Sequence, residues 1–335
     1  MKNIKKVLVL VLTLILILSL VGCNTDSLKE YKKAAEKTEQ VDKGQSSGEF
    51  ILTMDFNTEG MSPEEIKELN YYKDIEGSFN VTYDNNLEKG IYRNYLNLGG
   101  LGFDYDIYCN SDEIFMKIPI VGKYMRLNPI MTSLDSKENK SKNEDIISEE
   151  TVKTISANWL SLMNKEDVFK GKNIVLTTPD GEVKSTEYTI KLSDEQIKKL
   201  FSDSIDSVYK DENFKEFYKN IQKNIESLND KTFEELYADV EGYISDYKVE
   251  NFSYIAYVDI DGYIVNEKIQ LDLSVDSKDE SSLVGLNYSI NINNWDFNKE
   301  QSFEFPILTD DNTVTTNDMD ESGSFIIEDM LNYID

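Results

Sequence analysis

The sequence contains no histidine, and its 335 residues include only two cysteines, two tryptophans and five prolines. The absence of histidine excludes Ser-His-Asp and Cys-His catalysis and argues against a typical zinc site. The sequence also has no glycine-rich loop of the kind that cradles a phosphate group. We therefore expect a protein that is not an enzyme and that carries neither a metal ion nor a cofactor.

Basic residues are also scarce, since 35 Lys and Arg stand against 63 Asp and Glu, for a formal net charge of −28. This excess argues against nucleic acid as a partner, because phosphates demand basic patches. With so many carboxylates, some pair always lies close, so no glycosidase-like pair stands out. The hydrophobic fraction of 40% and the aromatic fraction of 11% are typical of a folded chain.

The beginning of the chain has the pattern of an export signal. A basic start at Lys2, Lys5 and Lys6 precedes an apolar run over residues 7–18, and small residues follow. The alternative is a membrane helix that is never cleaved. The stretch over residues 7–21 is shorter than the roughly 20 residues that span a bilayer, which favours the export signal.

The segment Leu20-Val21-Gly22-Cys23 directly follows the apolar run and matches the bacterial lipobox. This resemblance implies a signal peptide over residues 1–22 and a diacylglycerol anchor on Cys23, whose two acyl chains hold a protein firmly. Residues 23–335 would then be an extracytoplasmic lipoprotein on the outer face of the cytoplasmic membrane. Abundant Lys, Asn, Asp and Ile indicate a Gram-positive source. With Cys23 modified, no internal disulfide can form.

Several segments repeat apolar residues with helical spacing, and capping boxes begin three of them, at Ser27, Ser62 and Ser193. Each box lets a side chain bond a free backbone N–H of the first helical turn. We predict helices over residues 28–41, from Ser62 onward, and over 149–163, 194–209, 214–225, 233–244 and 325–334.

In other segments apolar and polar residues alternate, as in strands with one buried face. We predict strands over residues 50–56, 79–83, 91–98, 101–109, 114–118, 174–178, 188–192, 252–260, 263–275, 286–293 and 302–307. Residues 44–48 are interpreted as a polar break, and residues 133–145 as a mobile surface loop. The elements come in two rounds, about 27–147 and 148–335, which we expect to share one sheet.

A sheet with one apolar face must cover that face, and the amphipathic helices are suited to the task. The pattern therefore predicts an α+β fold with a large antiparallel sheet and helices packed on its apolar side.

The order of these elements resembles Gram-positive lipoproteins that share the half-barrel of the LolA and LppX-type lipid carriers. The segments that carry the resemblance are 31–37, 50–54, 114–118, 123–127, 188–196 and 259–263, after the lipobox. The resemblance implies a curved sheet whose apolar face is plugged by helices, with a cavity for acyl chains. No catalytic residue comes with it, and shared fold alone does not fix function.

Two residue groups remain as candidates for chemistry. Cys109 lies on the apolar face of its predicted strand, so we interpret it as a core residue and not as a reactive thiol. Asp259-Ile260-Asp261-Gly262 is similar to the start of a calcium loop, but strand-like residues follow it, and Asp-Gly is a common hairpin turn. We therefore predict a turn there and no metal site.

The leading hypothesis is a binding lipoprotein that holds a lipid or an acylated molecule between sheet and helices. The predicted lining of the cavity is Leu101, Phe103, Tyr105, Leu271, Leu273 and Tyr288. The same residues could instead form a filled core. A second hypothesis is a surface interaction or scaffold protein of the cell envelope, without a ligand cavity.

Overall fold

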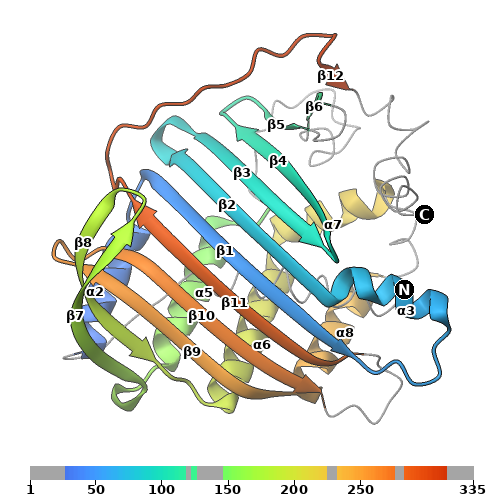
Figure 1. Cartoon of the computed structure of the whole chain (residues 1–335), viewed down its shortest axis with the longest axis horizontal. Helices are drawn as coiled ribbons and strands as arrows, with labels where there is room; N and C mark the ends of the chain where they lie inside the picture. Colours follow the sequence, from blue (N-terminus) through green and yellow to red (C-terminus); the bar gives the residue numbers. More distant parts are fainter. Residues whose placement is uncertain (1–26, 118–121, 127–145, 225–231, 276–282, 315–335) are drawn as a thin grey trace.

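The computed structural model describes residues 27–117, 122–126, 146–224, 232–275 and 283–314. It shows an α+β protein in which one large, mostly antiparallel sheet, curved and not closed, packs against a layer of helices (Figure 1). The predicted fold class and the antiparallel sheet are therefore confirmed. Cys23, the predicted loop 133–145 and the predicted helix 325–334 lie outside the described residues. Within the described ranges, every helix is too short or too polar to cross a membrane.

The helices are α2 (Ser27–Glu39), α3 (Pro63–Lys73), α5 (Glu149–Leu162), α6 (Asp194–Lys210), α7 (Glu212–Asn224) and α8 (Phe233–Asp246). The strands of the first round are β1 (Lys43–Phe56), β2 (Asp74–Asp84), β3 (Lys89–Leu98), β4 (Leu101–Cys109), β5 (Ile114–Lys117) and β6 (Tyr124–Arg126). The later strands are β7 (Val168–Thr178), β8 (Gly181–Ile190), β9 (Tyr247–Asp259), β10 (Ile264–Val275), β11 (Leu283–Trp295) and β12 (Thr313–Val314).

The strands form one 12-stranded sheet in the order β12-β6-β5-β4-β3-β2-β1-β11-β10-β9-β8-β7. The early strands and the late strands thus form two halves of the sheet, side by side, and they meet where β1 pairs with β11. Among the described late strands, β12 alone lies with the early strands, where it pairs in parallel with β6 and forms the edge of the sheet.

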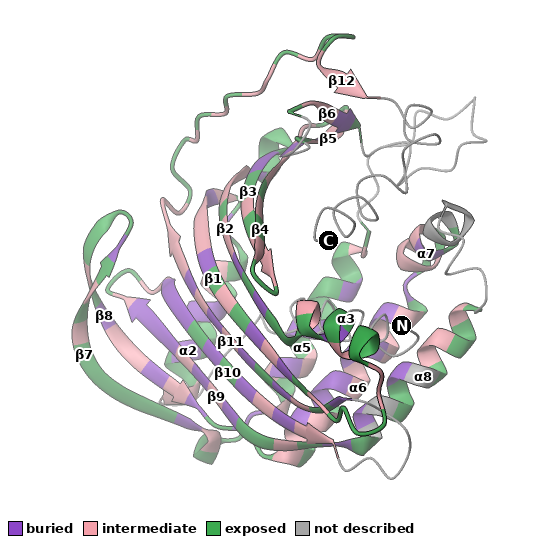
Figure 2. Ribbon diagram, turned by 45° about the vertical axis from the view of Figure 1, so that its right-hand side comes forward, coloured by how far each residue is buried: buried purple, intermediate pink, exposed green. Residues whose placement is uncertain are grey.

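The core lies between the later strands and helices α2, α5 and α6 (Figure 2). Leu271 of β10 pairs with Phe252 on one side and with Tyr288 on the other, and Tyr288 pairs with Leu52 of β1. All four side chains are buried, because alternate residues of each strand point toward the helices. Each such burial contributes about 1.5–3 kcal/mol. The term "inner face" denotes this helix-facing side of the sheet, and "outer face" the opposite side.

Helix α6 begins where its capping residues predict. The Gln196 backbone N–H donates to Ser193 Oγ at 3.2 Å, and the Ser193 N–H donates to Gln196 Oε1 at 2.8 Å. The following turns place Ile197 and Leu200 on the buried side of the helix. The same reciprocal box at Ser62 begins α3, so local hydrogen bonds mark both starting points.

Residues 44–48, predicted as a polar break, belong instead to β1. The ring of Phe79 on β2 lies directly over Gly48, and the ring of Phe50 lies over Gly77 in the same way. Each glycine leaves room for an aromatic ring from the neighbouring strand, and a side chain there would collide with it. Pairing with β2 and β11 on both sides keeps this polar stretch in the strand.

Residues 302–307, predicted as a last strand, do not pair with the sheet. They belong to an extended segment, here called the strap (residues 296–312), that runs from β11 to β12 over the rim of the sheet (Figure 1). The Phe305 ring lies 6.2 Å from that of Tyr108, which stacks on Phe115 at 5.1 Å. The alternating apolar residues of the strap therefore pack against the outer face, and the strap does not pair with a neighbouring strand.

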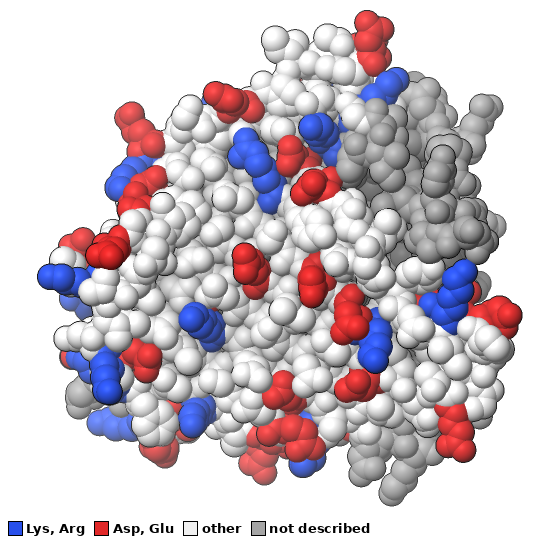
Figure 3. All heavy atoms as spheres, viewed as in Figure 1, with Lys and Arg blue, Asp and Glu red and all other residues white. Residues whose placement is uncertain are grey.

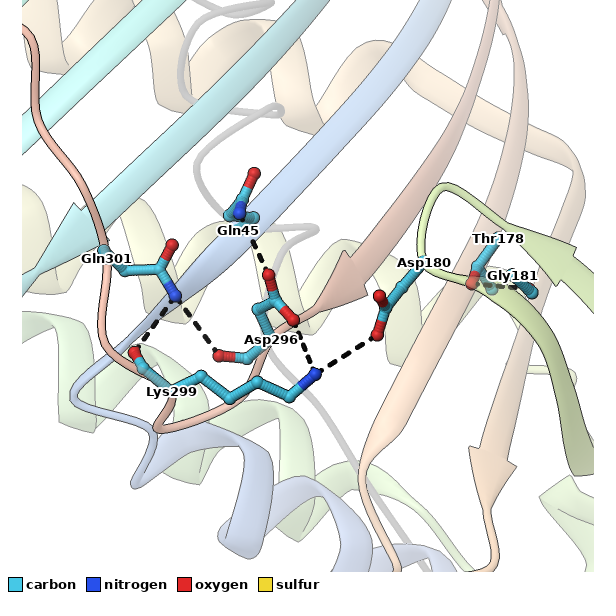
Figure 4. Close-up of polar contacts among 7 residues, drawn as sticks. All are labelled: Gln45, Thr178, Asp180, Gly181, Asp296, Lys299 and Gln301. Carbon is cyan, nitrogen blue, oxygen red and sulfur yellow. Dashed lines mark hydrogen bonds and ion pairs between the residues drawn. The ribbon is translucent and has the colours of Figure 1, made fainter.

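The strap is held at the corner where it leaves β11 (Figure 4). Asp296 accepts hydrogen bonds from Gln45 of β1 at 3.0 Å and from Lys299 at 2.6 Å. Lys299 also lies 3.3 Å from Asp180 in the β7–β8 turn, and the Gln301 amide donates to the Lys299 carbonyl at 3.0 Å. These exposed contacts are individually weak, about 0–1 kcal/mol for a surface ion pair, but they fix the direction in which the strap starts.

Candidate functional site

A carboxyl group lies buried between the sheet and the helices. Glu267 of β10 is 8% exposed and pairs with Ala256, a fully buried residue of the core. The hydroxyl of Tyr254 on β9 donates a hydrogen bond to Glu267 Oε1. Burial raises the pKa of Glu267 to about 7, although hydrogen bonds from Tyr254 and Asn294 act to lower it. The Tyr254 ring lies 6.1 Å from that of Tyr31, which links this pair to α2.

Glu267 is not among the predicted site residues, because the buried face of its strand was predicted from apolar residues alone. The signal was nevertheless present. Glu267 stands in the same odd-numbered row as Ile269, Leu271 and Leu273, and all three are buried. A charged residue within such a row is expected to be buried as well, and burial disfavours its ionised form.

Helix α2 is attached to the sheet through polar and aromatic contacts of consecutive residues. Glu30 accepts hydrogen bonds from Lys170 at 2.6 Å and from the Tyr188 hydroxyl at 2.8 Å. Both bonds lower the pKa of Glu30, and the bond from Lys170 has the larger effect. The next residue, Tyr31, stacks on the Tyr188 ring at 5.8 Å. The first helix after the predicted anchor is thus joined directly to β7 and β8.

The six residues predicted to line a cavity all lie on the inner face, but in two separate places. The first group, on β10 and β11, is buried in the core beneath the helices and consists of Leu271, Leu273 and Tyr288. The second group, on β4, is partly exposed and consists of Leu101, Phe103 and Tyr105. Strands β3, β2 and β1 lie between the two groups in the sheet.

The inner face of β3–β5 is apolar yet only partly covered. We call it the inner apolar surface, made of Leu96, Leu101, Phe103, Tyr105, Ile107 and Met116, all of intermediate exposure. The described helices pack mainly elsewhere, on β7, β9 and β10, with α3 against β1 and β2. Burial raises the pKa of Tyr105 and raises that of the neighbouring Cys109 to about 11, so both groups stay neutral. Cys109, expected in the core, is half-buried in this region.

Three buried polar atoms in the helix–sheet layer have no hydrogen-bond partner in the described part of the chain. They are Trp159 Nε1 on α5, Ser204 Oγ on α6 and the Tyr288 hydroxyl on β11. Burial raises the pKa of Tyr288 well above its ordinary value. Native proteins leave few buried polar atoms unpaired, and each one calls for an explanation such as a water molecule or a ligand group.

The Asp259–Gly262 segment forms the turn of the β9–β10 hairpin. Asp259 Oδ1 accepts a hydrogen bond from the Tyr263 N–H at 2.8 Å, and Gly262 adopts a positive φ of 88°. The carboxylate of Asp259 is therefore used within the turn itself. Among the residues that the structure describes, no three Cys, Asp or Glu side chains gather as a metal site.

These features define a class of protein, an α+β domain with an open curved sheet and helices on one face. No protein-family model matches this chain, and no curated protein matches it. Among solved structures, a β-barrel-like protein of the domain of unknown function DUF1849 from Brucella abortus is aligned over 76% of this chain and 100% of that chain. The identity is 9% and the TM-score is 0.17, so this similarity carries no argument about fold or function.

Proposed function

We propose that this chain is a non-enzymatic lipoprotein, tethered through Cys23 to the outer face of the cytoplasmic membrane. Its sheet would act as a LolA-like half-barrel that holds a hydrophobic ligand, a lipid or an acylated molecule. The observation that carries the proposal is the inner apolar surface, which continues the core yet stays partly exposed. Folded proteins rarely leave contiguous apolar surface open unless it binds something.

The chemistry of the inner apolar surface suits an acyl chain. Phe103 and Tyr105 form a ring pair with centroids 6.2 Å apart, and the aliphatic side chains of Leu96 and Ile107 flank them on the same face. A flexible hydrocarbon gains affinity from apolar area and needs few polar contacts. Since Leu271, Leu273 and Tyr288 are already packed by the helices, we place the ligand at the β4 end, against Leu101, Phe103 and Tyr105.

Lipid extraction tests the proposal directly. The full-length chain, purified from membranes in mild detergent, is extracted with organic solvent, and the extract is analysed by mass spectrometry. We expect near-stoichiometric lipid beyond the acyl chains covalently attached to the protein. A protein that carries less than about one lipid in ten molecules would rule out the carrier function and favour the envelope scaffold instead.

A pair of substitutions locates the ligand. Phe103→Glu places a charge within the inner apolar surface and should lower the lipid content at least fivefold, because an ionised carboxylate is poorly solvated beside hydrocarbon. Val175→Glu is the matched control, since Val175 is 56% exposed on β7, away from that surface. Equal lipid content in both variants would contradict this placement.

The two cysteines provide an internal test of the anchor. Cys23→Ala should abolish incorporation of labelled fatty acid and release the protein from the membrane fraction. Cys109→Ala should retain both the label and the membrane association, because the Cys109 thiol is half-buried on β4. Label that persists in Cys23→Ala would contradict lipidation at this site.

A further inference from the structure

The outer face of the sheet carries a trough that is separate from the inner apolar surface. Figure 3 views this face, and charged side chains are sparse over its middle. Two adjoining hollows of about 570 Å³ and 520 Å³ form the trough, across strands β9, β10, β11, β1, β2, β3 and β4. Both hollows are lined by Glu49, Ser78, Tyr95 and Asn291, so they form one continuous feature, here called the outer trough.

A single row of paired residues runs along the outer trough from strand to strand. In sheet order the row is Lys268, Asn291, Glu49, Ser78, Tyr95 and Asp104. Neighbouring strands lie 4.7–4.9 Å apart, so the row spans about 24 Å. This length suits an extended oligomer better than a single small molecule.

Two amide groups are held in place to donate hydrogen bonds into the trough. The buried Asn266 amide donates to Asn291 Oδ1 at 2.8 Å, to Asn293 Oδ1 at 2.9 Å and to the Ile292 carbonyl at 2.8 Å. With both Oδ1 atoms engaged, Asn291 and Asn293 present their Nδ2 groups, which donate to no described residue. Asn266 Oδ1 is itself buried without a partner. Preorganised donors of this kind fix the orientation of a ligand at low entropic cost.

An aromatic ring lies further along the same row, three strands away from Asn291. Tyr95 of β3 lies over Gly102 of β4, which has no side chain to lift the ring, and Tyr95 remains 38% exposed. Ile51 of β1 is 49% exposed in the same trough, and Ile255 lines its other end. The trough thus combines hydrogen-bond donors with a flat apolar platform.

The charges along the outer trough disfavour an anionic polymer. Two cations, Lys268 and Arg93, stand against four carboxylates, Glu49, Glu76, Asp104 and Asp106. An anionic chain would meet this acidic excess on a molecule whose net charge is already −28. The remaining polar lining consists of hydroxyls and amides, which are suited to neutral groups that both donate and accept hydrogen bonds.

We propose that the outer trough binds an N-acetylated oligosaccharide. The Asn291 and Asn293 amides donate to acetamido carbonyls, and Ile51 contacts the acetyl methyl groups. The Tyr95 ring packs against a pyranose face, as an amphipathic ring does at interfaces. The serines and carboxylates of the lining pair with the sugar hydroxyls. This site does not depend on the inner ligand, because the two lie on opposite faces of the sheet.

Calorimetric titration of the detergent-purified full-length chain with chitohexaose, a neutral N-acetylated hexasaccharide, tests the proposal. We expect saturable binding in the micromolar range and at least tenfold weaker binding of cellohexaose, which lacks acetamido groups. Undetectable binding of chitohexaose at millimolar concentration would overturn the proposal, and so would equal binding of the two sugars.

Matched variants assign the binding to the trough. Asn291→Ala and Tyr95→Ala should each weaken chitohexaose binding at least tenfold. Asn287→Ala, on the same strand and face but outside the trough, and Tyr92→Ala, on the inner face of β3, should leave binding within twofold of wild type. Circular dichroism of every variant verifies the fold. Equal loss in the trough variants and in their controls would overturn the assignment.

Discussion

Tyr254 and Glu267 form a buried hydrogen bond between β9 and β10, with the tyrosine hydroxyl as the donor. Both side chains lie beneath the helix layer, where Trp159 of α5 packs edge-on against Tyr254 at 5.9 Å and Tyr31 of α2 lies 6.1 Å away. A titratable group is thus enclosed where two helices meet the sheet. Its protonation is therefore coupled to the stability of this layer.

Replacement of Glu267 by Gln should change how stability depends on pH. The pKa of Glu267 is about 7 in the folded protein against an ordinary value of 4.5. Because the folded state keeps its proton longer than the unfolded state, wild-type stability falls as pH rises from 4.5 to 7. This shift corresponds to a loss on the order of 3 kcal/mol. The free energy of unfolding of Glu267→Gln, measured with urea, should not show this decrease. Between pH 4.5 and 8 the stability of wild type should therefore fall relative to that of the variant.

The control for this experiment is Glu182→Gln, which removes a carboxyl from an exposed position on β8. Its unfolding free energy should follow the wild-type pH dependence across the whole range. If wild type and Glu267→Gln differ by a constant amount from pH 4.5 to 8, Glu267 is not the group that titrates in this window.

Substitution of Trp159 should separate packing from hydrogen bonding. Trp159 is 1% exposed, and its Nε1 has no partner among the described residues. Trp159→Ala should cost about 3–5 kcal/mol, because it opens a cavity between α5 and β9. Trp159→Phe keeps most of the ring and breaks no described hydrogen bond, so we expect a clearly smaller loss. Chemical unfolding compares the two, and equal losses would mean that the indole N–H is engaged after all.

Two glycines should respond to alanine in opposite ways. Gly48→Ala places a methyl group against the Phe79 ring, so it should destabilise the protein by about 1–3 kcal/mol through overpacking. Gly242→Ala, in α8 with open space around it, should stabilise by up to about 1 kcal/mol, since alanine favours helices. Thermal unfolding of both variants gives the sign of each change in stability. A neutral Gly48→Ala would show that the ring moves aside at little cost.

Removal of the strap's aromatic rings should loosen one edge of the sheet. The double variant Phe303→Ala, Phe305→Ala uncovers Tyr108 and Phe115 on the outer face. Amide hydrogen exchange should accelerate in β4 and β5 and stay unchanged in β9 and β10, because local opening follows local packing. Ile307→Ala is the control within the strap, since Ile307 is 84% exposed. Uniform acceleration across the sheet would instead indicate global destabilisation.

Sequence patterns identified most elements because they record local physics. The capping boxes at Ser62 and Ser193 act within one helical turn, so they can be identified from the sequence without knowledge of the fold. Alternation located β9, β10 and β11, whose buried rows are continuous. The same patterns could not show that β4 lies apart from β10 and β11 on the inner face, because strand order is set by distant pairing. The predicted cavity lining was therefore divided between two places.

The sequence by itself determined the α+β class, the positions of most helices and the apolar side of the later strands. It did so because helix caps and side-chain periods depend on near neighbours only. Tertiary structure alone decided that the polar residues 44–48 continue β1 and that the strap packs without pairing. It also brought the outer trough together from separate strands. Each of these depends on which strand lies alongside, and only the folded chain supplies that neighbour.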